Sequence, residues 1–220
     1  MTHSGHRLGN RASLLGDWVI LARMPYDYPP EIQRKMKTLV RICARHNPVC
    51  ISSYDKDGKV IRYMAGWEGR QVSAVHISSS IEDVANDPIL QHHAVYTNKE
   101  DVLNVVKEIK EAELGIPIVV AGLFDEVFDI CEKIETEPHT VNLCVGTFGN
   151  LKLLPEPHIL ELVTMCGHGR VSSNLARHLI DKVKKREMTP KEAAIELGKQ
   201  CTCNILNPIR AEKIISDATS

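Results

Sequence analysis

Three thiols and an imidazole gather in the last quarter of this 220-residue chain. Cys166 and His168 belong to a Cys-Gly-His-Gly turn, and Cys201 and Cys203 follow as a Cys-X-Cys pair. Thiolates and imidazoles bind zinc, thiolates bind iron–sulfur clusters, and a free thiolate is also a nucleophile. We therefore take Cys166, Cys201 and Cys203 as candidate metal ligands, and Cys166 and His168 as candidate catalytic residues.

Each cysteine group stands shortly before a predicted helix. Cys166 leads into a helix over 171–186, and Cys203 precedes one that begins at Pro208. The positive end of a helix lowers the pKa of a nearby thiol. The region from Cys166 to the end carries ten Lys/Arg and six Asp/Glu, a net charge of +4, in a chain whose net charge is −1. This excess suits stabilised thiolates or an anionic ligand, and equally a solvated helix face.

A helical hairpin is expected to bring the two groups together. The segments 171–186 and 190–199 both have helical patterns, and such a hairpin returns the chain close to its start, so that Cys201 can approach Cys166. The glycines that flank His168 lack Cβ, which allows backbone N–H groups to turn toward an anion. The spacing therefore predicts one shared site rather than two separate groups.

Three protein thiolates leave one coordination position for an outside ligand. On a [4Fe–4S] cluster this position opens one iron, which then acts as a Lewis acid. We expect such a cluster rather than zinc, with His168 as a further ligand or a hydrogen-bond donor. The expected function is a metal-dependent enzyme of the lyase, hydratase or desulfidase type that acts on a small anionic molecule.

The five residues Met165-Cys166-Gly167-His168-Gly169 also carry a resemblance. They resemble the Met-Cys-Gly-His-Gly signature of proline racemases and hydroxyproline epimerases, and more loosely the corresponding motif of diaminopimelate epimerase. This resemblance implies a cofactor-independent isomerase in which two cysteines exchange an α-proton across an amino acid. Cys201 or Cys203 would be the second cysteine. A third alternative is a non-catalytic accessory protein that a metal stabilises.

Composition narrows the class of partner. Lys and Arg number 27 against 28 Asp and Glu, so no global field attracts nucleic acid or an anionic membrane. No apolar run approaches the roughly 20 residues of a membrane helix. Seven cysteines without an export signal suggest free thiols in a reducing compartment. We expect a cytoplasmic homo-oligomer that binds neither nucleic acid nor membrane.

The first half of the chain predicts an antiparallel sheet. A helix is expected over 31–46, followed by alternating runs at 49–54 and 60–65 that a turn at 55–58 joins. A third run, 71–77, extends this sheet. His92 and His93 are expected at the end of a short helical turn, where they are candidate substrate contacts.

The middle of the chain has a βαβαβ pattern. Strands are expected at 94–96, 116–121 and 140–145, with helices over 99–113 and 123–135 between them. This order is typical of a parallel sheet with right-handed crossovers. The predicted fold class is α/β, with a mixed sheet and a C-terminal helical cluster.

The chain is expected to divide into a flexible arm over 1–16, an α/β domain over 17–153 and a helical, cysteine-containing domain over 154–220. In open α/β sheets, ligands bind in the loops at the carboxyl edge. The predicted substrate contacts are Gly122, Asp125, Thr147, Asn150 and Arg170.

Overall fold

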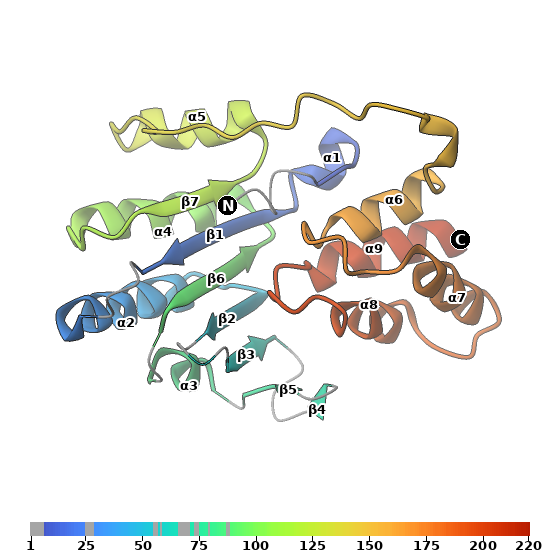
Figure 1. Cartoon of the computed structure of the whole chain (residues 1–220), viewed down its shortest axis with the longest axis horizontal. Coiled ribbons are helices and arrows are strands. Elements are labelled where there is room, and N and C mark those ends of the chain that lie inside the picture. Colours follow the sequence, from blue (N-terminus) through green and yellow to red (C-terminus); the bar gives the residue numbers. More distant parts are fainter. Residues whose placement is uncertain are drawn as a thin grey trace.

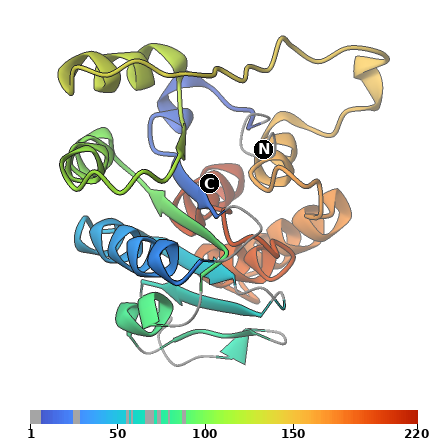
Figure 2. The same ribbon diagram turned by 60° about the vertical axis from the view of Figure 1, so that its left-hand side comes forward.

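The computed structural model describes residues 7–24, 29–54, 57, 59–65, 71–72, 75–78, 80–86 and 89–220. A five-stranded sheet lies between two layers of helices (Figures 1 and 2). Its strands, in the order β3-β2-β6-β1-β7, are β3 (Val60–Met64), β2 (Cys50–Tyr54), β6 (Gln91–Tyr96), β1 (Trp18–Arg23) and β7 (Ile118–Ala121). A separate small hairpin pairs β4 (Gln71–Val72) with β5 (Val75–His76).

Helices cover both faces of the sheet. One layer holds α2 (Pro30–Arg45), α3 (Ile81–Asn86), α4 (Lys99–Glu111) and α5 (Phe124–Lys133). The opposite layer holds α6 (Pro157–Thr164), α7 (Ser173–Lys184), α8 (Pro190–Gly198) and α9 (Pro208–Thr219). Two shorter elements are α1 (Arg11–Leu14) and the 3-10 turn η1 (Leu151–Leu153).

The predicted parallel sheet is wrong, because every neighbouring pair in the five-stranded sheet is antiparallel. β6 and β7 do run in the same direction, but β1 lies between them and is antiparallel to both. The interior strand β1 is a continuous apolar run, which suits a position where helices cover both faces. The predicted sheet did not include this strand.

The strand predicted at 140–145 does not form. Residues 138–150 contain no helix or strand, and the side chains of 136–151 are exposed. The alternation of apolar residues that favours a strand is present, but within the described residues this segment has no strand beside it. The turn predicted at 55–58 lies largely outside the described residues.

Two βαβ units interlock in the sheet. In β1–α2–β2 the strand β6 separates the two parallel strands, and in β6–α4–β7 the strand β1 does so. This is the split βαβ arrangement of the ferredoxin-like topology, with β3 added beyond β2. Because α2 and α4 both lie on one face, the other face is free for the C-terminal helices.

The helices predicted over 171–186, over 190–199 and from Pro208 are confirmed as α7, α8 and α9, because their ends are signalled locally. Proline occupies the first position of α6, α8 and α9. Thr189 and Glu192 form a reciprocal capping box at α8, while Ser172 and Asn207 cap α7 and α9. These helices share one core with the sheet, through residues such as Val19 and Leu21.

The N-terminal segment is held against the C-terminal helices over residues 7–16. Arg7 and Arg210 both form ion pairs with the buried carboxylate of Asp17, the second at 2.6 Å. Arg210 also donates to the carbonyl of Leu8 at 2.6 Å. Residues 1–6 of the predicted flexible arm lie outside the described residues.

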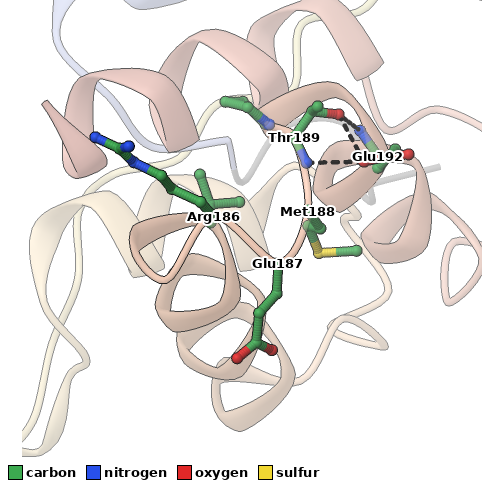
Figure 3. Close-up of a pocket in the computed structure, with 7 residues that line it drawn as sticks. Arg186, Glu187, Met188, Thr189 and Glu192 are labelled. Carbon is green, nitrogen blue, oxygen red and sulfur yellow. Dashed lines mark hydrogen bonds between the residues drawn. The ribbon is translucent and has the colours of Figure 1, made fainter.

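A surface depression of about 440 Å³ lies at the turn between α7 and α8 (Figure 3). The hydrogen bonds of the Thr189–Glu192 capping box form part of its wall. Its lining is Val183, Arg186, Glu187, Met188, Thr189, Pro190 and Glu192. This lining contains no cysteine or histidine, so the chemistry predicted from the sequence lies elsewhere.

Candidate metal centre

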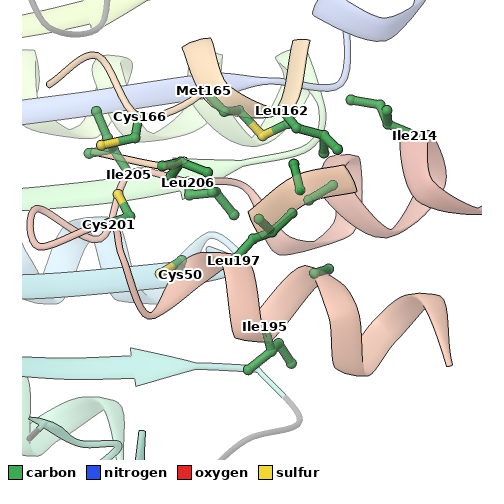
Figure 4. Packing of buried hydrophobic residues seen from close by; sticks show 14 of the residues in the cluster. Cys50, Leu162, Met165, Cys166, Ile195, Leu197, Cys201, Ile205, Leu206 and Ile214 are labelled. Atoms are coloured by element: carbon green, nitrogen blue, oxygen red, sulfur yellow. The ribbon is translucent and has the colours of Figure 1, made fainter. Parts of the chain in front are cut away.

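The three C-terminal cysteines meet between the end of α6, the loop joining α8 to α9, and the sheet. Cys166 follows α6, and Cys201 and Cys203 belong to the α8–α9 loop. All three are buried. Figure 4 shows Cys166 and Cys201 among apolar side chains such as Leu206, with Cys50 on the nearby strand. The predicted convergence of residues 35 positions apart is therefore confirmed.

The donor atoms lie close enough to share one ion. The ligand atoms of Cys166, His168 and Cys203 are all within 4.8 Å of one another. The Sγ atoms of Cys201 and Cys203 are 3.6 Å apart. This group of cysteine and histidine side chains can therefore bind a metal.

The three thiols form a hydrogen-bonded group around Cys166. Hydrogen bonds from the thiols of Cys201 and Cys203 hold the pKa of Cys166 well below its usual range. The same interaction with Cys166 raises the pKa of Cys201 to about 11, and it also strongly raises the pKa of Cys203. A cation bound by these thiols would take the place of their protons.

Backbone amides complete the environment of the sulfurs. The N–H groups of His168 and Arg170 donate to Cys166, and that of Leu206 donates to Cys201. The turn closes with a hydrogen bond of 2.9 Å from the Gly169 N–H to the Cys166 carbonyl. Gly169 has a φ of +63°, a conformation that favours glycine.

The source of these amides differs from the expectation. We predicted that helix N-termini would face the thiols, but α7 begins at Ser173 and α9 at Pro208, several residues after each cysteine group. The donors belong instead to the irregular turns that carry the cysteines. The side chains of His168 and Arg170 are exposed, so this turn forms the solvent side of the site.

The sheet holds the cysteine loop through its carbonyl groups. Arg62 Nη2 donates to the carbonyls of both Cys201 and Thr202 at 3.1 Å. His93 Nδ1 lies 2.6 Å from the Cys203 carbonyl. Further donors to the carbonyls of this loop are Tyr54, Ser52 and Cys50. Because these carbonyls bind the sheet, the loop has a defined conformation with its two thiols toward Cys166.

Sequence reasoning missed this support. The residues come from β2, β3 and β6, more than 100 positions before the loop. The available signal was a set of polar residues inside strands that are otherwise apolar: Ser52, Arg62 and His93. Strand alternation places one such residue per strand on the face toward α6–α9.

Arg62 places a positive charge beside the loop that carries Cys201 and Cys203. Its side chain is buried, and within the described residues it has no carboxylate at ion-pair distance. Its Nε atom has no hydrogen-bond partner there. A buried cation is costly unless an anion lies nearby. The hydrogen bonds of the guanidinium to the carbonyls of Cys201 and Thr202 place its charge next to the cysteine loop.

The two adjacent histidines lie on β6 and not in the predicted helical turn. Both are fully buried, and they point to opposite faces of the sheet. His93 faces the cysteine loop. His92 faces the other layer, where its Nδ1 lies 3.3 Å from Ser53 Oγ. Burial, with a smaller contribution from His93, lowers the pKa of His92 to about 3.

The predicted substrate contacts before residue 154 make contacts that do not involve the cysteine site. A Cβ at Gly122 would lie 2.6 Å from the ring of Trp18, so glycine is required there for packing. Asp125 forms an ion pair with Arg11 at 2.7 Å. Asn150 caps η1, and Thr147 is exposed in the irregular segment. These residues were placed at the edge of a parallel sheet that does not form.

Comparison with protein-family models, with curated proteins and with solved structures finds no match for this chain. Within the part of the chain that the structure describes, no helix has the length and apolar character needed to cross a membrane.

Proposed function

We propose that Cys166, Cys201 and Cys203 hold an iron–sulfur cluster. The observation that carries the proposal is the convergence of three buried thiols with the His168 imidazole, from two loops 35 residues apart. All seven cysteines are free thiols, as a cluster protein of a reducing cytoplasm requires. The buried charge of Arg62 supports an anionic centre at this place.

The surroundings of the sulfurs favour a cluster. N–H groups from His168, Arg170 and Leu206 point at the cysteine sulfurs, and hydrogen bonds of this kind tune cluster potentials. A Cys-X-Cys loop can serve two different irons, and the two sulfurs, 3.6 Å apart here, would have to separate to bind the cluster in this way. Three thiolates leave the fourth iron open to an outside ligand.

Zinc is the second candidate, and one distance favours it. Two thiolates on a single tetrahedral zinc lie about 3.8 Å apart, since each zinc–sulfur bond is about 2.3 Å. Cys201 and Cys203 are separated by 3.6 Å. With His168 as fourth ligand, the site would be closed and structural, as the accessory-protein alternative requires.

In the enzyme that we propose, the cluster supplies a Lewis acid to a small anionic substrate. His168 lies within reach of the cysteine sulfurs and is open to solvent, where its imidazole transfers a proton to or from the bound molecule. Arg170 is exposed on the same turn and binds a carboxylate. This residue set suits elimination, hydration or desulfuration.

The racemase alternative has less geometric support. Two cysteines that exchange a proton across a carbon must stand on opposite sides of it, each about 3–3.5 Å away, which separates them by roughly 6–7 Å. Here the Sγ atoms of Cys166 and Cys203, one of the two pairs that could exchange the proton, lie within 4.8 Å of each other. A metal between the sulfurs fits this arrangement better than a substrate carbon.

Metal analysis of protein purified without oxygen tests the proposal. We expect iron and acid-labile sulfide with a broad visible absorption, lost in Cys203→Ser and retained in the control Cys43→Ser. Cys43 is equally buried, but it belongs to α2 on the other side of the sheet. Zinc without sulfide would replace the cluster by a structural ion. Protein without any metal would overturn the proposal, and α-proton exchange on amino acids would then be assayed.

A further inference from the structure

A row of apolar side chains is exposed along residues 140–145, where a strand was predicted, and along the residues that follow. The row lies within residues 140–154, and its members have exposed fractions of 39 to 82%. They are Val141, Leu143, Val145, Phe148, Leu151, Leu153 and Leu154. Contiguous apolar surface of this kind marks an interaction site in a folded protein.

The composition of this segment is that of an interface core. Between Glu137 and Lys152 there is no Asp, Glu, Lys or Arg. Apolar residues alternate from Val141 to Val145, which is the pattern of a strand with one buried face. Depletion of charge distinguishes the core of a protein interface from the remaining surface.

The same chain carries an open sheet edge that matches this segment. Among the described residues, β7 pairs only with β1, so its outer backbone groups are free. Val119 on β7 is partly exposed, and the neighbouring α5 exposes Phe124 and Phe128, whose rings lie 5.7 Å apart. An unpaired edge strand is a template for a strand from another chain.

We propose that residues 140–145 of one copy add to β7 of a second copy, and that a two-fold axis repeats the exchange. In each copy the segment passes α5 and continues to α6 without pairing with its own β7 (Figures 1 and 2). The occupant is a second copy because one chain presents both the open edge and the matching strand. Because the segment has no charged side chains, it offers no ion pairs to a charged partner of another kind.

Cross-linking distinguishes exchange between chains from pairing within one chain. Cys144 is an exposed thiol within the segment 140–145. The change Val119→Cys introduces a second exposed thiol, on the edge strand β7 that would receive this segment. A short bis-maleimide should join Cys144 of one chain to the thiol introduced at position 119 of the other and give a covalent dimer. The control Val119→Cys with Cys144→Ser should remain monomeric on a denaturing gel. A cross-link within a single chain, or none between these positions, overturns the proposal.

Light scattering after size-exclusion chromatography provides the second measurement. The wild-type protein should be a dimer, and Leu143→Glu should shift it to a monomer, because a carboxylate would be buried in the interface. Ile209→Glu is the matched control, since Ile209 is an exposed apolar residue on α9, away from the segment. A monomeric wild-type protein, or a dimer that Leu143→Glu leaves intact, contradicts the proposal. The outcome is independent of the metal content.

Discussion

The face of the sheet toward α2 and α4 packs through apolar side chains such as Ile20 and Ile51, whereas the face toward α6–α9 presents Arg62 and His93 to the cysteine loop. Both faces are covered by helices, so burial does not distinguish them. The difference is the use of polar strand residues to bind the carbonyls of an irregular loop. Two neighbouring residues of one strand therefore provide a test variant and its control, because one side chain faces the cysteine loop and the other faces the opposite layer of helices.

The largest effect is expected from Arg62→Met. This change removes two hydrogen bonds from a charged donor to the cysteine loop, at a cost of roughly 3 kcal/mol in the free energy of unfolding. The proposed metal should also be released faster to a chelator. Urea unfolding and a chelator challenge measure the two effects. The neighbour Ile61 packs on the opposite face, so Ile61→Val should retain the metal. Equal metal release from both variants would contradict the role of Arg62.

His92 should make the free energy of unfolding depend on pH. The unfolded chain protonates this histidine below its ordinary pKa of about 6.5, but burial keeps the folded form neutral down to about 3. The contribution of neutral His92 to the free energy of unfolding is therefore fully present above pH 6.5. It is lost as the pH falls, by roughly 2 kcal/mol at pH 5.

Urea unfolding of the wild type and of His92→Phe at pH 5 and 7 measures this contribution. The wild type should lose more stability than the variant between the two pH values, because the variant lacks the titrating group. The same dependence in both proteins would assign it to other residues. The metal content of His92→Phe should be unchanged at pH 7, since His92 faces away from the thiols.

His93→Phe is expected to weaken the site on the opposite face. The Cys203 carbonyl loses its partner at 2.6 Å and keeps only the longer bond from Ser52 at 3.4 Å. We expect a loss of roughly 1.5 kcal/mol in the free energy of unfolding and faster release of the metal. Chelator competition, with His92→Phe as the control, checks this prediction. A greater metal loss from the control would reverse the assignment of the two faces.

The smallest effect is expected from Gly169→Ala. No atom lies within 4 Å of the added methyl group, so the cost comes only from the positive φ at this position, about 1 kcal/mol. Gly198→Ala is the control, since that site is equally open but has no positive φ. Thermal unfolding should show a decrease for the first variant only. A similar decrease in both would mean that φ is not the cause.

Local patterns in the sequence predicted the elements that local interactions form. The helix over 31–46 and the runs at 49–54 and 60–65 correspond to α2, β2 and β3. The C-terminal helices were found for the same reason, since proline and capping residues mark where they begin. The sheet order could not be found in this way, because strand pairing joins distant residues and β1 inserts between β6 and β7.

The donor types of the candidate site, three thiols and an imidazole beside glycines, are readable from the chain alone, as is the helical hairpin that returns Cys201 toward Cys166. The support of the loop by Arg62 and His93 required the folded molecule, because those contacts span more than 100 residues and strand alternation does not say which element covers each face. The folded molecule was also needed to show that residues 140–145 remain without a strand partner, since an apolar alternation predicts a strand but not the edge that receives it.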